Sequence, residues 1–167
     1  MPPLERMTIK KVTLVGLVAL AFSAAAQDAL DSDWQETKTP APPAFNQDRL
    51  VALEMPPYVS MRFGVDPSTL TITPDGVVRY VMVATNATGS FSAMYEGIRC
   101  ATGEVKVYAR SSAVGNWNVI KDPQWQALNR MVSKHAMVFA RRAACADGTS
   151  ATAKSVDAIV KALNSPY

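Results

Sequence analysis

Between residues 69 and 110, several segments alternate apolar with polar residues, and this period of two is typical of β-strands. Residues 69–73 predict one such strand, because leucine and isoleucine alternate there with threonine. Residues 77–84 are apolar at nearly every position except Arg79, so we expect a central strand covered on both faces. The Pro-Asp-Gly sequence at 74–76 favours a tight turn, which predicts that the two strands form a hairpin.

Further strands are predicted on both sides of this hairpin. A short strand at 50–53 precedes it, longer strands at 91–100 and 104–110 follow, and a last short strand is expected at 117–120. The segment 62–67 is expected to form a turn. One face of the fourth long strand is predicted to be polar throughout, and its residues are Glu104, Lys106, Tyr108 and Arg110.

The period of the pattern changes after Lys121, where helices are predicted. Asp122 followed by Pro123 is typical of a helix start, and a longer helix is expected at 133–144. Ser155 is the expected N-cap of a last helix, whose apolar residues repeat at i, i+3, i+4 and i+7. Strands followed by helices indicate an α+β domain, in which an antiparallel meander of hairpins is packed on one face by carboxy-terminal helices.

The first 26 residues have the order of a secretory signal peptide. Three basic residues precede an uncharged run at 12–26, whose apolar core of about eleven residues is shorter than the roughly 20 of a membrane-spanning helix. Ala24 and Ala26 are small residues of the kind that signal peptidase recognises, so we expect cleavage after Ala26. A buried helix of the mature fold is the alternative, but it leaves the preceding lysines unexplained. The mature protein is expected outside the cytoplasm, without a transmembrane segment.

Two regions are expected after the signal peptide: a proline-rich extended arm at 27–47 and a single α+β domain at 48–167. Trp34 and Phe45 are the large apolar residues of the arm, which either docks on a partner or lies on its own domain. Two of the three net positive charges of the chain belong to the signal peptide. The mature protein therefore lacks the clustered cations of a nucleic-acid-binding surface.

Cys100 and Cys145 are the two cysteines of the chain, and exported domains with an even number of cysteines usually pair them. A bond between them would close a loop of 44 residues, which the chain-entropy model values at roughly 4 kcal/mol. A redox pair or a zinc site is the alternative, but the chain has no C-x-x-C sequence and a single histidine, His135. We therefore expect a structural disulfide, and no metal or cofactor.

Ionisable and aromatic residues gather near the end of the strand at 91–100. Glu96 could act there as an acid or a base with Arg99 as an anion clamp, or the two could form an ion pair. His135 could move a proton, although without a serine or cysteine nucleophile motif beside it a structural histidine is the simpler interpretation. No catalytic residue is assigned, and the candidate ligand-binding residues are Tyr95, Glu96, Arg99, Tyr108 and Arg110.

Four motifs carry a family resemblance: Arg62-Phe63-Gly64-Val65-Asp66-Pro67, Asp75-Gly76-Val77-Val78-Arg79-Tyr80-Val81, Tyr95-Glu96-Gly97-Ile98-Arg99-Cys100 and Lys106-Val107-Tyr108-Ala109-Arg110. They resemble the cryptic neisserial protein-like family of Gram-negative envelope proteins, and the resemblance extends from about Trp34 to Leu163. It implies a periplasmic location, or a peripheral one at the outer membrane. It supplies no catalytic residues.

Two functions follow as hypotheses. The first is a non-enzymatic envelope module that binds a partner through the arm or the polar sheet face. The partner would be an envelope protein or a ligand, and the sequence does not identify it. The second is a small ligand-binding protein or hydrolase with a site near Glu96, Arg99 and Tyr108, joined by His135. The second hypothesis requires these four side chains to converge in one cleft.

Overall fold

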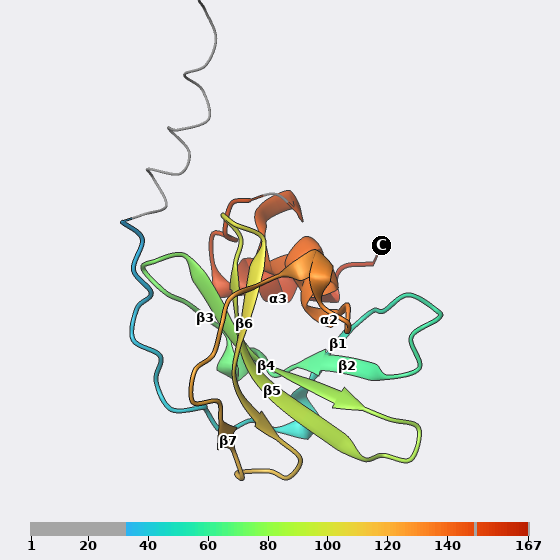
Figure 1. The fold of residues 1–167 in the computed structure, drawn as a ribbon. Coiled ribbons are helices and arrows are strands. Elements are labelled where there is room, and N and C mark those ends of the chain that lie inside the picture. Colours follow the sequence, from blue (N-terminus) through green and yellow to red (C-terminus); the bar gives the residue numbers. More distant parts are fainter. Residues whose placement is uncertain (1–32, 149, 167) are drawn as a thin grey trace, which may run out of the picture. The chain divides into compact units, whose positions relative to one another are not determined.

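One antiparallel sheet organises the described part of the chain, residues 33–148 and 150–166 of the computed structural model (Figure 1). The expected signal peptide at 1–26 lies outside these residues. From Gln35 onward the chain forms one unit. The strands described are β1 (Val51–Leu53), β2 (Arg62–Val65), β3 (Thr71–Ile72), β4 (Val77–Thr85), β5 (Phe91–Arg99), β6 (Glu104–Ser111), β7 (Asn118–Val119) and β8 (Gln126–Ala127).

Hydrogen bonding orders the strands as β1-β2-β4-β5-β6-β7, with β3 also beside β4 and β8 beside β6. The predicted hairpin of β3 and β4 is confirmed, since the backbone N–H of Thr73 donates to the carbonyl of Val77 at 3.0 Å. Gly76 has a φ of 83° in this turn, a conformation that glycine adopts without steric cost. β4 and β5 have nine residues each and pair along their whole length at the centre of the sheet.

The turn predicted at 62–67 is wrong, because its first four residues form β2. Phe63 and Val65 are both buried on one side of this strand, which pairs with β1 and with β4. Gly64 serves close packing here rather than chain reversal: a Cβ on it would lie 3.0 Å from the Cβ of Leu50. The chain turns only after β2, at Asp66.

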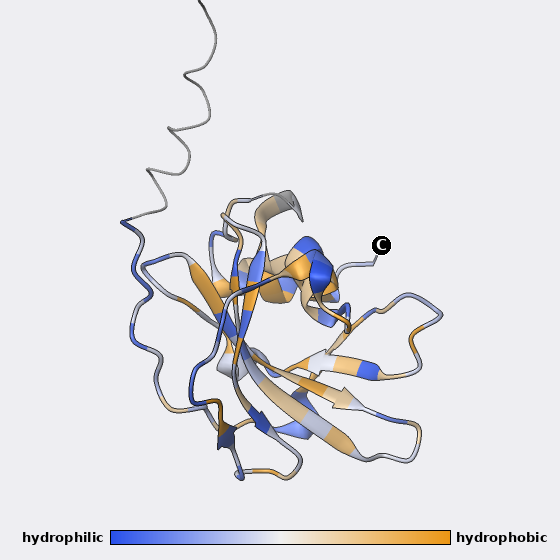
Figure 2. Cartoon of the chain, in the orientation of Figure 1, coloured by the Kyte–Doolittle hydropathy of each residue, from blue (hydrophilic) through white to orange (hydrophobic). Residues whose placement is uncertain are grey.

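The helices lie together on one face of the sheet (Figure 1). α2 (His135–Phe139) continues into a π-helical turn at Ala140–Ala144, and α3 spans Val156–Asn164. Ser155 caps α3 as predicted, because its Oγ accepts a hydrogen bond from the backbone N–H of Ala158 at 3.1 Å. Both helices carry hydrophobic and hydrophilic residues, as expected of helices that bury one side (Figure 2). The predicted α+β class is confirmed.

The helix predicted at Asp122 and Pro123 does not form. Asp122 Oδ1 accepts a hydrogen bond from the Gln124 side chain at 2.8 Å instead of capping a helix. The chain then adds β8 to the edge of β6 and makes a 3-10 turn at Leu128–Arg130. The backbone N–H of Leu128 donates to the carbonyl of Gly103 at 2.9 Å, so pairing with the sheet replaces helical hydrogen bonds here.

Residues 35–47 of the arm lie on the sheet face opposite the helices. Phe45 is 7% exposed and packs edge-on against Phe91 and Trp117, with ring centroids 6.2 and 5.8 Å away. The backbone N–H of Asn46 also donates to Asp66 Oδ2 at 2.7 Å. Of the two alternatives for the arm, the structure therefore has it lying on its own domain.

A β-bulge in β6 changes which residues share a face. Tyr95 pairs with Ala109 while Glu96 pairs with Val107, so Tyr108 is the extra residue of β6. Beyond the bulge, Arg110 pairs with Met94, which belongs to the helix-side core. The prediction of one polar face from residue 104 to residue 110 is therefore wrong, because the bulge moves Arg110 to the other side of the sheet.

Cys100 and Cys145 form the predicted disulfide, with 5.6 Å between their Cα atoms. Cys100 directly follows β5, and Cys145 directly follows the π-helical turn. The bond therefore ties the end of a central strand to the end of the helical segment, as expected. Among the described residues, no helix is both long and apolar enough to cross a membrane.

Candidate functional site

The sheet separates the five candidate ligand-binding residues. Tyr95 and Tyr108 belong to the arm-side core, and Arg99 shares their side of β5 by strand alternation. Glu96 and Arg110 lie on the helix side. The convergence of Glu96, Arg99, Tyr108 and His135 in one cleft is therefore not observed, but Glu96 and His135 do meet.

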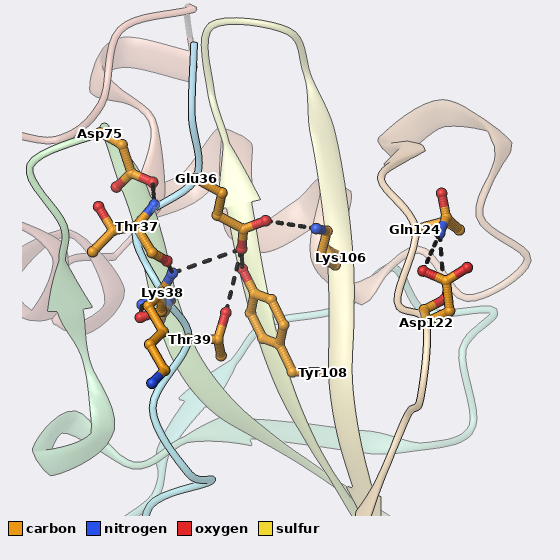
Figure 3. A network of polar contacts seen from close by, with 10 residues as sticks. Glu36, Thr37, Lys38, Thr39, Asp75, Lys106, Tyr108, Asp122 and Gln124 are labelled. Atoms are coloured by element: carbon orange, nitrogen blue, oxygen red, sulfur yellow. Dashed lines mark hydrogen bonds and ion pairs between the residues drawn. The ribbon is translucent and has the colours of Figure 1, made fainter.

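On the arm side, the carboxylate of Glu36 is held by β4 and β6 (Figure 3). Lys106 Nζ lies 2.5 Å from its Oε2, and the hydroxyl of Tyr108 donates to Oε1 at 2.6 Å. Arg79, which is 2% exposed, forms an ion pair with Oε1 at 3.6 Å and donates to the backbone carbonyls of Thr37 and Lys38. Hydrogen bonds and ion pairs from side chains of the sheet to one carboxylate and two backbone carbonyls of the arm thus hold the arm on the sheet.

Two groups in this contact have shifted pKa values. Burial raises the pKa of Glu36, but hydrogen bonds from Lys106 and Tyr108 and the charges of Lys106 and Arg79 outweigh it, so the pKa lies below its ordinary value. Burial, with the hydrogen bond to Glu36, raises the pKa of Tyr108 well above the usual range. Tyr108 therefore stays protonated and remains a donor to the carboxylate.

On the helix side, three buried polar side chains form a second cluster. Tyr80 and Glu96 are opposite each other on β4 and β5, and the Tyr80 hydroxyl donates to Glu96 Oε2 at 2.8 Å. His135, the first residue of α2, places Nε2 at 3.0 Å from both carboxylate oxygens of Glu96. The ring of Phe63 stacks on the imidazole with 5.1 Å between centroids and holds its orientation.

This hydrogen-bond network assigns the tautomer of His135. Burial raises the pKa of Tyr80 well above its usual range, and so do the charge and hydrogen bond of Glu96, so Tyr80 is a permanent donor to Glu96. An ionised Glu96 only accepts, and Nε2 of His135 must therefore carry the proton that points at it. In the neutral imidazole this leaves Nδ1 with a free lone pair.

Ser133 completes the cluster at the surface. Its Oγ lies 2.7 Å from His135 Nδ1, and the residue is exposed. Because Nδ1 holds the lone pair, the serine hydroxyl is the donor in this contact. A series of hydrogen bonds thus runs from the solvent-accessible hydroxyl of Ser133 through the base His135 to the buried carboxylate of Glu96. This is the arrangement that activates serine nucleophiles. The sequence pointed to Glu96 and His135, but not to Ser133 or Tyr80.

A surface cavity of about 350 Å³ opens beside Ser133 and His135. Met94 and Met131 give it an apolar lining, and Arg110 and Arg130 bring two cations. A larger cavity of about 410 Å³ lies beside the disulfide, where Arg141 is the charged lining residue, and it contains no pair of nucleophile and base. Within the described residues, no three histidine, cysteine or acidic side chains lie close enough to hold a metal ion.

The fold and the site define a disulfide-bonded α+β domain with a Ser-His-Glu hydrogen-bond chain at the edge of a cationic cavity. The chain belongs to the CNP1-like family, whose model matches residues 29–164. This match confirms the resemblance to the cryptic neisserial protein-like family. No curated protein and no solved structure matches the chain.

Proposed function

We propose that the protein is an exported hydrolase of the cell envelope that cleaves esters with Ser133 as nucleophile. Its export to the periplasm is supported by the signal-peptide pattern of residues 1–26 and by the disulfide, which persists in oxidising compartments. The observation that carries the activity is the unbroken contact from Ser133 Oγ through both nitrogens of His135 to Glu96.

The contrast in burial within this chain of contacts favours a catalytic role over a purely structural one. Glu96 is 0% exposed and His135 is 2% exposed, so neither meets bulk water, whereas Ser133 is exposed beside a cavity. Burying a carboxylate and an imidazole is unfavourable unless they are paired, and such pairs are weak sources of stability. A hydroxyl that is both accessible and bonded to the buried base is what nucleophilic catalysis requires.

The reaction follows from the hydrogen-bond directions. Ser133 Oγ attacks the ester carbonyl carbon while its proton passes to His135 Nδ1, and negative charge collects on the carbonyl oxygen. The carbon–oxygen bond to the alcohol then breaks, and the alcohol leaves with the proton from Nδ1. Water next gives a proton to Nδ1 and attacks the acyl carbon, and the acid leaves as the proton returns to Ser133.

Glu96 and Tyr80 are positioning residues in this scheme. The carboxylate of Glu96 accepts the hydrogen bond from Nε2 and stabilises the imidazolium that forms when His135 holds two protons. The low dielectric of the buried site strengthens this interaction. Tyr80, which bonds Glu96 and packs against Phe139 with 4.5 Å between ring centroids, fixes the direction of the carboxylate.

Hydrolysis of p-nitrophenyl butyrate by the purified mature chain tests the proposal, with Ser133→Ala as the decisive variant. We expect kcat/KM to fall at least about 100-fold, as is typical when base-activated attack is removed. Ser60→Ala is the matched control, because Ser60 is exposed in the loop between β1 and β2. Equal rates for the wild type and Ser133→Ala would overturn the proposal.

A second candidate function is the binding of an extended acidic segment of an envelope partner on the arm-side face. It is favoured by the contacts of Glu36, whose carboxylate meets Lys106, Tyr108 and Arg79 as a bound ligand would. A synthetic peptide with the sequence of residues 33–46 should bind the full-length Glu36→Gln variant, whose own arm is weakened, more tightly than the wild type. Absence of binding to both chains would contradict this candidate.

A further inference from the structure

We propose that the cavity beside Ser133 selects esters whose acyl chain ends in a carboxylate, and that Arg110 and Arg130 bind this carboxylate. This inference rests on the proposed function and deepens it by naming the substrate class. The esters in question have an apolar methylene segment between the reacting carbonyl and the acid group.

The two arginines are available to a ligand. Both are exposed and line the cavity, and neither guanidinium makes a hydrogen bond or an ion pair with any residue in the described part of the chain. Arg110 reaches this side only because the bulge at Tyr108 reverses the alternation of β6. Arg130 comes from the 3-10 turn that follows β8. Two separate elements thus bring unpaired positive charges to one cavity.

None of the residues that line the cavity is acidic, so no carboxylate among them neutralises the two arginines. The carboxylate of Glu96 lies behind His135, is fully buried and already accepts hydrogen bonds from His135 and Tyr80. The cavity therefore carries a net positive charge toward solvent. Guanidinium groups bind carboxylates through paired N–H donors, which gives both affinity and orientation.

The remaining lining favours an apolar segment next to the charge. Met94 and Met131 line the cavity, and Val132, which is 100% exposed, stands at its rim beside Ser133. Methionine side chains adapt to irregular apolar ligands, and an exposed valine gains from being covered. A linear acyl chain can lie on these residues while its carbonyl meets Ser133 and its terminal acid meets the arginines.

A matched pair of substrates tests the inference: mono-p-nitrophenyl adipate and its methyl ester, which differ in whether the distal carboxylate is charged. We expect the wild type to prefer the acid by about 10-fold in kcat/KM, with the preference reduced in high salt because the arginines are exposed. Arg110→Gln and Arg130→Gln should each lower the ratio of kcat/KM for the acid to kcat/KM for the methyl ester toward one. Equal rates for the two esters, both dependent on Ser133, would overturn the inference and leave the proposed function standing.

Binding to a catalytically silenced chain separates the two claims. Calorimetry with Ser133→Ala should detect the acid and not the methyl ester, and adding Arg110→Gln should weaken binding of the acid about 10-fold. This result would support the recognition of the carboxylate even if the wild type hydrolysed neither ester. Failure of the wild type to hydrolyse either ester would overturn the proposed function but not the recognition of the carboxylate. Equal binding of the two esters to Ser133→Ala would contradict the inference whatever the rates.

Discussion

His135 Nε2 lies 3.0 Å from both carboxylate oxygens of Glu96, and the two residues come from the first turn of α2 and the middle of β5. The contact joins the helical layer to the sheet inside the core. It also directs the free lone pair of the imidazole outward to Ser133. One buried pair therefore contributes both to the packing of α2 on the sheet and to the proposed chemistry.

Replacing Glu96 by glutamine should affect both roles. The amide cannot stabilise an imidazolium as a carboxylate does, so we expect ester hydrolysis to fall at least about 100-fold. The weaker pairing with His135 and Tyr80 should also lower the free energy of unfolding by about 1–3 kcal/mol. Urea titration and kinetics on the same preparation measure the two effects, with the exposed Glu54→Gln as control. A variant with full activity would show that Glu96 is structural only.

Ser133→Ala separates catalysis from stability. Ser133 is exposed, but its hydroxyl donates to Nδ1 of the buried His135, so its replacement should lower the free energy of unfolding by about 1 kcal/mol. The same substitution should remove nearly all ester hydrolysis. A thermal scan beside the kinetic assay therefore distinguishes loss of a nucleophile from loss of the fold, and a folded Ser133→Ala chain that keeps its activity would contradict the proposed role of this hydroxyl.

Low pH should weaken the contact between the arm and the sheet, because it protonates Glu36. Its pKa in the folded protein lies below the ordinary value of 4.5, so the ionised carboxylate stabilises the fold at higher pH. This contribution is present above the unfolded pKa and is lost as the pH falls through the lower, folded pKa. The urea midpoint of the wild type should fall more steeply below pH 4.5 than that of Glu36→Gln. Parallel pH profiles for the two chains would argue against the contact.

Gly97 leaves room for the hydroxyl of Tyr108, which bonds Glu36. A Cβ at this position would lie 2.5 Å from Tyr108 Oη and 2.9 Å from Val77 Cγ1. Gly97→Ala should therefore displace the tyrosine and lower the free energy of unfolding by about 1–3 kcal/mol. Denaturant titration checks this loss. An unchanged Gly97→Ala chain would show that β5 and β6 can adjust.

The long strands of the sheet could be predicted from local patterns, but the strands β2 and β8 were missed, and the faces could not all be predicted. The β3–β4 hairpin followed from the Pro-Asp-Gly turn, and Ser155 was found from its capping position. The bulge at Tyr108 has no local sequence signal, because it depends on how β6 pairs with β5. It decides that Arg110 lies near Ser133 rather than near Lys106.

Only part of the candidate site could be predicted from the sequence, for a similar reason. Glu96 and His135 are 39 positions apart, and their contact depends on which face of β5 the helices cover. Ser133 stands two positions before the only histidine, and that spacing could have drawn attention to it. Its significance appears only when the imidazole is known to be buried against a carboxylate. Pairing of Cys100 with Cys145 was predictable because the chain has no other cysteine.

Labelling with a fluorophosphonate tests the account most directly, because this reagent phosphonylates only serines that a neighbouring base activates. The serine oxygen displaces fluoride from phosphorus, and the serine proton leaves through His135. We predict one adduct per chain, located at Ser133 by peptide mass spectrometry, at least about 100-fold slower in Glu96→Gln and absent in Ser133→Ala. Lack of any adduct on the folded wild type, or an adduct that forms equally fast in Glu96→Gln, would contradict the proposed role of the Ser133, His135 and Glu96 contacts.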